Sequence, residues 1–178
     1  MSIPQMLARM EHKIGWVFQC KLTAIEALNS AGQPIFYDGQ WHILRRNDQL
    51  AIIGDKAIDL VLGVMWYRST NTEGRYYSKG IMSELQRDLV SNEPLATCGF
   101  SHDLDGCVIT NAGHVGRISE RMMATAVEAI VGAVFKDSGF DPEAVRTVMA
   151  RLGFFKHQLL ANTDCKSLAG HTNPTPEA

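Results

Sequence analysis

Residues 48–60 read DQLAIIGDKAIDL, an apolar stretch that carries ionisable side chains in its interior. Apolar residues recur in this stretch at helical spacing, so we expect a long helix that begins after Asn47. A buried carboxylate without a partner costs free energy in a folded protein. Asp55 therefore needs a neighbouring cation, a bound metal ion or access to water.

A second apolar stretch, residues 118–136, has the same property. Glu128 is the only charged residue between Met122 and Phe135. Helical spacing places positions 51 and 55 on one face of the first helix and positions 125 and 128 on one face of the second. Two interpretations stay open from the residues alone. Either the acids pair with Lys56, a distant arginine or another helix, or they belong to a functional site.

The composition is that of an ordinary globular protein. Of its 178 residues, 46% are hydrophobic and 20% are charged, with a net charge of −2 and a pI near 6.3. These values exclude collagen-like, disordered and disulfide-rich proteins. They also give no global basic signal for a nucleic acid or an anionic membrane. No apolar run reaches the roughly 18 residues that cross a bilayer, so we expect no membrane partner.

The cysteines and the first residues bear on the compartment. No two of the four cysteines form a CxxC pair, which favours reduced thiols in an intracellular protein; they are Cys20, Cys98, Cys107 and Cys165. Residues 1–7 read MSIPQML and lack both a secretory apolar core and an arginine-rich transit stretch. We therefore expect the cytosol, with the mitochondrion as the alternative.

Helical periodicity also dominates the rest of the chain. Besides the helix after Asn47, which residues 69–74 interrupt, the pattern predicts helices over residues 4–14, 21–30, 78–92, 118–136 and 142–152. Residues 102–114 are irregular, and no pair of strands is indicated. We therefore expect one all-α domain over residues 1–160 and a disordered tail over residues 161–178.

Four segments, in order along residues 7–155, resemble the ribonuclease III family. The signature helix of that family reads approximately ERLEFLGDS, which residues 48–56 resemble as DQLAIIGDK. Its second acidic helix reads DxxEALIGAxxxDSG, which residues 125–139 resemble as TAVEAIVGAVFKDSG. Residues 14–28 resemble the opening of the family, and residues 89–96 its middle helix junction. The resemblance implies the all-α endonuclease-domain fold of ribonuclease III.

The resemblance also implies a magnesium site, from which this sequence departs. The family holds magnesium over a phosphate of double-stranded RNA with four carboxylates, which are the hard oxygen ligands that this ion prefers. Position by position, two of these acids remain as Asp55 and Glu128, while Ala51 and Thr125 replace the other two. Lys56 stands where the family has a small residue, and its ammonium could replace the metal as the local positive charge. This comparison predicts impaired or absent hydrolysis.

A rearranged magnesium site is the alternative. Asp48 fills a secondary acidic position of the signature, and Glu73-Gly74 resembles a Glu-Gly pair that the family has near its cleavage site. Asp48 and Glu73 could then join Asp55 and Glu128 around a weakly bound magnesium ion.

A zinc site is not expected, although the ligand types for one are present. Cys98, His102, Cys107 and His114 follow one another in a loop-rich region. Their spacing fits no standard zinc finger.

Short basic clusters could contact the phosphates of RNA, or they could simply be solvated. The arginines expected to bind nucleic acid are Arg45, Arg46, Arg75, Arg117 and Arg121. Arg68 and Lys79 flank the same turn as Arg75.

The resemblance further implies a symmetric dimer. Family members bury an aromatic residue of the signature helix in the other subunit, and Ile52 holds that position here. We expect a homodimer; a heterodimer with an intact paralogue is compatible with the same residues. We interpret five aromatic residues as part of the core or of the dimer surface rather than as base-stacking platforms; they are Trp16, Trp41, Trp66, Tyr76 and Tyr77.

Three functions follow as hypotheses. The leading one is RNA-related binding or assembly in which a degenerate ribonuclease III fold acts as a scaffold. The second is an active, magnesium-dependent endoribonuclease that cuts double-stranded RNA. The third is a dimer that binds a small molecule or a protein in the former catalytic groove.

Overall fold

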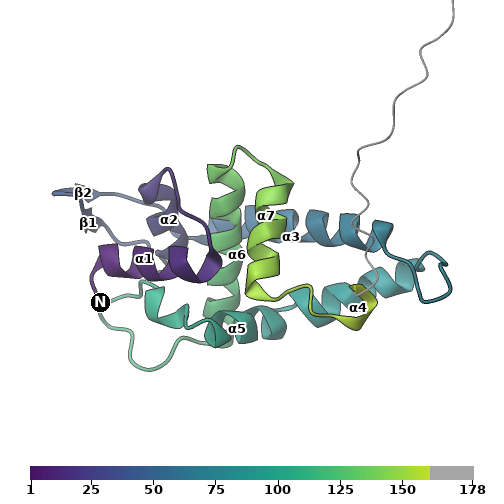
Figure 1. The fold of residues 1–178 in the computed structure, drawn as a ribbon. Coiled ribbons are helices and arrows are strands. Elements are labelled where there is room, and N and C mark those ends of the chain that lie inside the picture. Colours follow the sequence, from purple (N-terminus) through teal and green to yellow (C-terminus); the bar gives the residue numbers. More distant parts are fainter. Residues whose placement is uncertain (161–178) are drawn as a thin grey trace, which may run out of the picture.

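The computed structural model describes residues 1–160 and confirms the all-α class (Figure 1). The expectation of a disordered tail concerns residues 161–178, which lie outside the described residues. The α-helices are α1 (Ile3–Ile14), α2 (Lys21–Leu28), α3 (Asp48–Arg68), α4 (Lys79–Val90), α5 (Asn92–Ser101), α6 (Glu120–Asp137) and α7 (Pro142–Leu152). Two short strands, β1 (Ile35–Tyr37) and β2 (Gln40–His42), and two 3-10 turns, η1 (Asp105–Cys107) and η2 (Gln158–Leu160), complete the described part.

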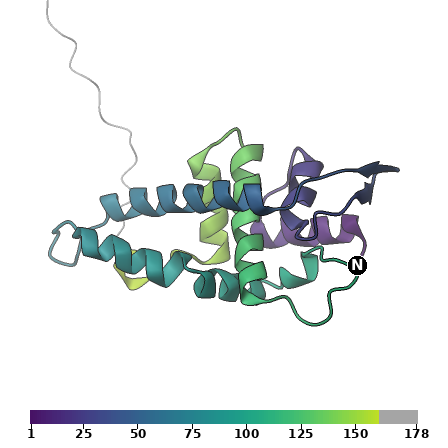
Figure 2. The ribbon, with the colours of Figure 1, turned by 180° about the vertical axis from the view of Figure 1, so that it is seen from behind.

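Helix α6 is the centre of the fold. It packs against α2, α3, α5 and α7, so that ten of its residues are buried on almost every side. Figures 1 and 2 show it standing upright, with α7 beside it and α3 crossing it. A helix this apolar is stable only inside a protein. Helix α6 therefore forms the core of the domain, and α2, α3, α5 and α7 cover it.

The ends of the helices follow from local sequence signals. Gly15 and Gly153 end α1 and α7 in the left-handed conformation, with φ of 71° and 85°. The carboxylate of Asp141 accepts a hydrogen bond from the backbone N–H of Glu143 at 2.9 Å, and Pro142 takes the first helical position. Asp141 is therefore the N-cap of α7, and Pro142 occupies its first turn.

Two parts of the chain differ from the sequence-based expectation. Strands β1 and β2 form an antiparallel hairpin, where no strand pair was expected. Its turn is Asp38-Gly39, with φ of 50° and 78°, the positive values that a tight two-residue hairpin turn needs. Residues 92–101 form a separate helix, α5, because Ser91 ends α4 in an extended conformation and begins α5.

A second, smaller hydrophobic cluster lies between α3 and α4. Leu62, Leu85 and Leu160 are its buried members. It holds together the long pair of helices that Figures 1 and 2 show extending away from the hairpin. Within residues 1–160, no helix has the length and apolarity that a membrane span requires.

Candidate functional site

The candidate site lies where α3 crosses α6, and two glycines make this crossing unusually close. A Cβ atom on Gly54 would lie 1.8 Å from the carbonyl oxygen of Glu128. A Cβ atom on Gly132 would lie 2.0 Å from the carbonyl oxygen of Leu50. The two backbones therefore touch, and only glycine fits at either position. This contact fixes Asp55, which follows Gly54, beside the segment of α6 that carries Glu128.

Burial along α6 confirms that positions 125 and 128 share a face. Thr125 and Glu128 are partly accessible, whereas the residues between and beside them are buried. On α3, Ala51 is only 5% exposed, and the side chain of Asp55 is 40% exposed. The crossing is thus partly open to solvent at Asp55 and Glu128, and the other two positions of the face carry a methyl group and a hydroxyl.

Lys56 neutralises Asp55. Its ammonium Nζ lies 2.7 Å from Oδ2 of Asp55 and 4.0 Å from a carboxylate oxygen of Asp59, one turn further along α3. The hydrogen bond to Asp55 and the charge of that carboxylate raise the pKa of Lys56, so the amine stays protonated. The structure thus contains the Asp55–Lys56 ion pair, which was one of the two interpretations that the sequence left open.

Glu128 has no such partner and sits in a less favourable environment. Burial, together with the nearby negative charge of Asp55, raises the pKa of Glu128 from 4.5 to about 7, and Lys56 offsets part of this effect. The carboxyl group is therefore a mixture of protonated and ionised forms near neutral pH. A side chain held at such a cost on an otherwise apolar helix is a marker of a functional position.

The secondary acids do not join this pair. Asp48 begins α3, where it pairs with Arg46 at 3.2 Å, and Glu73 lies beyond the end of α3, where it pairs with Arg75 at 3.4 Å. Helical rise over α3 puts the two about 30 Å apart, too far to share one ion within a chain. The structure thus brings together Asp55 and Glu128 but neither Asp48 nor Glu73.

These residues do not fit a magnesium ion of the family type. One of the two carboxylates at the crossing already accepts a hydrogen bond from an ammonium, and burial raises the pKa of the other. Within residues 1–160, no three His, Cys, Asp or Glu side chains are placed so that they could hold a metal ion. Magnesium needs several hard oxygen ligands, so the crossing in this chain is too poor in ligands to hold it.

The residues with zinc-compatible side chains have other contacts. Cys98 Sγ and His102 Nε2 both donate to the carbonyl oxygen of Leu152, at 3.6 and 3.1 Å. Burial raises the pKa of the Cys98 thiol to about 12, which disfavours its thiolate form in this environment. Cys107 is fully buried, whereas His114 lies in an exposed loop.

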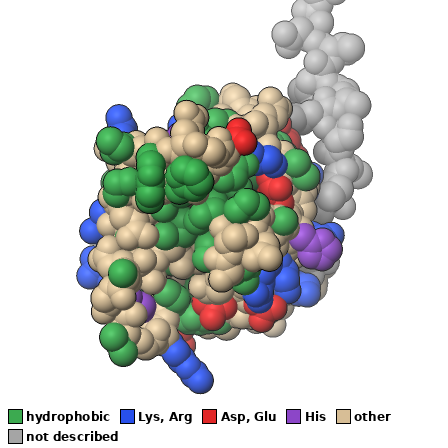
Figure 3. Space-filling view, turned by 90° about the vertical axis from the view of Figure 1, so that its left-hand side faces the viewer, with side chains coloured by type: hydrophobic (Ala, Val, Ile, Leu, Met, Phe, Trp, Pro, Cys, Tyr) green, Lys and Arg blue, Asp and Glu red, His purple; other side chains and the backbone are tan. Residues whose placement is uncertain are grey.

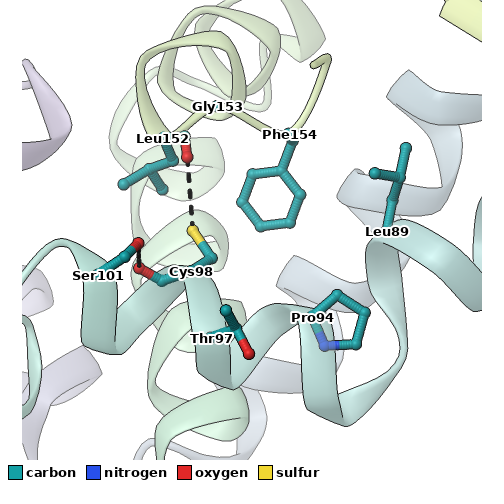
Figure 4. Close-up of a pocket in the computed structure, with 8 residues that line it drawn as sticks. All are labelled: Leu89, Pro94, Thr97, Cys98, Ser101, Leu152, Gly153 and Phe154. Atoms are coloured by element: carbon teal, nitrogen blue, oxygen red, sulfur yellow. Dashed lines mark hydrogen bonds between the residues drawn. The ribbon is translucent and has the colours of Figure 1, made fainter. Parts of the chain in front are cut away.

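Cys98 also lines a small apolar hollow between the α4–α5 junction and the end of α7 (Figure 4). Its volume of about 240 Å³ is below the range of about 300–1,000 Å³ that is usual for ligand pockets. Neither Asp55 nor Glu128 lines it. Its walls are Leu89, Pro94, Thr97, Cys98, Ser101, Leu152, Gly153 and Phe154.

The predicted RNA-contacting arginines are distributed over separate parts of the surface. Arg45 and Arg46 precede α3 and bind Gln49 and Asp48, respectively. Arg117 and Arg121 flank the start of α6, and neither forms an ion pair with another described residue. Arg75 lies in the loop between α3 and α4, with its side chain 80% exposed.

Exposed aromatic and aliphatic side chains are the feature that the sequence analysis did not locate. Trp16 is half-buried and donates from Nε1 to Asp137, as expected of a core residue. Trp41 on the hairpin is 71% exposed and Tyr76 is 82% exposed. Phe36 and Ile43, on or beside the hairpin, are also exposed, and Figure 3 shows hydrophobic side chains gathered on this end of the molecule. The Asp38-Gly39 pair was the available signal for the hairpin that carries three of them.

Comparisons with known proteins agree with this description. A family model described as ribonuclease-III-like matches residues 36–153. The chain is 28% identical over 150 residues to ribonuclease 3 of Caldanaerobacter subterraneus subsp. tengcongensis, covering 83% of this chain and 62% of that protein. It is 27% identical over 161 residues to ribonuclease 3 of Pseudomonas putida, covering 89% of this chain and 65% of that protein. The matched part thus spans less than two thirds of these relatives.

Two solved structures share the fold. Both are of the nuclease domain of ribonuclease III from Campylobacter jejuni, at 24% sequence identity. One gives a TM-score of 0.65 and covers 81% of this chain and 93% of that domain, and the other gives 0.66 with 84% and 93%. The first of these structures is described as flexible in a region involved in dimer formation of that domain.

Proposed function

The chain belongs to the ribonuclease-III-like family, and from this premise we propose that it is an RNA-binding member whose catalytic site has lost metal-dependent hydrolysis. In this role the helical fold holds RNA or an RNA–protein assembly and does not cut it. Binding then requires cations and exposed contact surface but no magnesium.

The observation that carries this proposal is the ion pair between Lys56 and Asp55. An ammonium 2.7 Å from the carboxylate oxygen supplies the positive charge beside Asp55 that a metal ion would otherwise supply. The two other acidic positions of the family are Ala51 and Thr125, which cannot replace negatively charged ligands. Loss of outer contacts alone lowers metal affinity by about 10–100-fold, and these changes affect the ligands themselves.

We also propose that the chain forms a homodimer through the exposed face of α3. Ile52 is 65% exposed on this face, with Leu60 at 49% and Val64 at 38%. Large apolar side chains that recur on one face of a helix favour a protein contact over solvent. The description of the Campylobacter jejuni domain as dimer-forming supports this assignment.

Binding of a labelled RNA hairpin, measured by fluorescence anisotropy in EDTA and in millimolar magnesium, tests the function. We expect salt-sensitive binding with the same affinity in both buffers. The variant Arg117→Gln/Arg121→Gln should lower the slope of log K against log salt by about 2, because each arginine that neutralises a phosphate releases about one counterion.

A matched control uses two cations that already have partners. Arg87 pairs with Asp88 at 2.8 Å, and Arg146 pairs with Glu143 at 2.6 Å. The variant Arg87→Gln/Arg146→Gln removes the same charge and should leave the salt slope near that of the wild type. Absence of RNA binding in both buffers would contradict the proposal and favour a dimer that binds a small molecule or a protein.

A further inference from the structure

We propose that the end of the molecule formed by residues 66–80, here called the α3–α4 tip, binds an unpaired segment of RNA by stacking bases on tyrosine. The proposal rests on the RNA-binding function proposed above and names the surface and the kind of RNA. Figures 1 and 2 place this tip at the opposite end of the molecule from the β1–β2 hairpin.

The tip concentrates aromatic and cationic residues. Three of the four tyrosines of the chain lie in it, with three cations and a single carboxylate, in a chain whose net charge is −2. This local excess of positive charge complements a phosphate backbone. The cations are Arg68, Arg75 and Lys79, and the carboxylate is Glu73.

Tyr76 is available to a ligand. It is 82% exposed, which is the reverse of what a core aromatic residue shows. Tyr67 is 75% exposed, but it lies on the face of α3 that we assign to the homodimer. Arg68 and Lys79 are exposed and form no ion pair with any other described residue. Exposed aromatic and cationic side chains in one short segment form the combination that binds unpaired nucleic acid, because rings stack on bases and cations contact phosphates.

The loop is held in one shape before any ligand arrives. The side-chain oxygen of Asn71 accepts hydrogen bonds from the N–H groups of Glu73 and Arg75, at 3.0 and 2.9 Å. The N–H of Asn71 donates to the carbonyl oxygen of Arg75 at 2.9 Å, and Thr70 bridges Tyr76 as in a β-ladder. Arg75 and Tyr76 are thus presented by a closed turn, which lowers the ordering cost of binding.

The base of the tip is fixed as well. Trp66 donates from Nε1 to the carbonyl oxygen of Ser78 at 3.2 Å, which ties the end of α3 to the start of α4. A duplex would not use this surface well, since its bases are already stacked on one another and offer no free face. Unpaired RNA, in a loop or at an end, offers both a base face and a phosphate.

The test measures binding of a labelled oligouridylate of about 12 nucleotides and of a blunt RNA duplex of equal length, both in EDTA. Tyr76→Ala should weaken binding of the single strand at least about fivefold, the low end for loss of one stacked base. Duplex binding should stay unchanged, and Tyr76→Phe should retain single-strand binding because the ring is kept.

Trp41→Ala is the matched control, because it removes an equally exposed aromatic ring from the hairpin at the other end. It should bind both RNAs as the wild type does, and all variants should melt at the wild-type temperature. Equal single-strand binding by Tyr76→Ala and the wild type, or binding of the duplex alone by the wild type, would overturn this inference and leave the RNA-binding function standing. No binding of either RNA would overturn both.

Light scattering, which measures the oligomeric state, tests whether the α3–α4 tip is instead a contact between two copies of the chain. If the α3–α4 tip contacts a second copy of the chain, Tyr76→Ala shifts the protein towards the monomer. That shift, with unchanged RNA binding, would also overturn the inference.

Discussion

Replacing Glu128 by glutamine should stabilise the protein at alkaline pH and change it little in acid. The pKa of Glu128 is raised from 4.5 to about 7, chiefly by burial and also by the charge of Asp55. A tenfold change in proton affinity corresponds to about 1.4 kcal/mol, so the ionised side chain costs the folded state up to about 3 kcal/mol. Because the side chain keeps some access to water, which screens its charge, we expect about 2 kcal/mol.

The sign of the pH dependence follows from the raised pKa. Below the unfolded-state pKa of 4.5, Glu128 is protonated in both states, and its folded state carries no penalty. As the pH rises towards 7, the unfolded state releases its proton first, so the free energy of unfolding falls. Above the folded-state pKa the full penalty is present. Glutamine, which cannot ionise, avoids it at every pH.

Urea unfolding followed by circular dichroism in EDTA measures this effect. Glu128→Gln should exceed the wild type by about 2 kcal/mol near pH 8 and by less than about 1 kcal/mol near pH 5. Glu143→Gln, at an exposed carboxylate, serves as the control and should show no such trend. A gain that is equal at both pH values, or a loss near pH 8, would refute the reasoning.

Three further predictions concern the crossing and its surroundings. Gly54→Ala should lower the free energy of unfolding by about 3 kcal/mol in a urea titration, because its methyl group would lie 1.8 Å from a backbone oxygen. Gly63→Ala is the control and should be neutral or slightly stabilising, because its methyl group would meet only Met82, at 3.9 Å. Asp137→Ala should cost about 2 kcal/mol in thermal or urea unfolding, because its carboxylate accepts hydrogen bonds from Trp16 and two backbone N–H groups; an unchanged midpoint would contradict this. Calorimetric titration with Mn²⁺ should detect no binding to the wild type, but binding to the variant A51E/K56S/T125D, which restores the two missing acids and removes the ammonium. Mn²⁺ binding by the wild type would contradict the claim that the Lys56–Asp55 ion pair replaces the metal.

The sequence predicted the helices other than α5, and the two acids, because their signals are local. Asp55 and Glu128 stand out as charges within apolar helices, and helical spacing alone places Thr125 beside Glu128. Their approach to each other depends on the crossing of α3 and α6, which periodicity cannot reveal. Gly54 and Gly132 were the available sign, because a glycine inside an apolar helix lowers its stability unless another backbone needs the space.

The hairpin escaped prediction for a different reason. Each strand has only three residues, too few for a period of two to be distinguished from chance. The Asp38-Gly39 pair was the stronger signal, because it supplies the two positive φ values of a tight turn. The exposure of Trp41 and Tyr76 also could not be read from composition, because aromatic residues are usually buried and only the tertiary fold decides which are not.

The most direct test of the central claim is incubation of the protein with long double-stranded RNA in magnesium and in manganese. The variant Asp55→Asn/Glu128→Gln is the control. We predict that the RNA stays intact with both proteins and is shifted on a native gel by the wild type. Discrete short products from the wild type, absent with the variant, would show a working metal site and contradict the account.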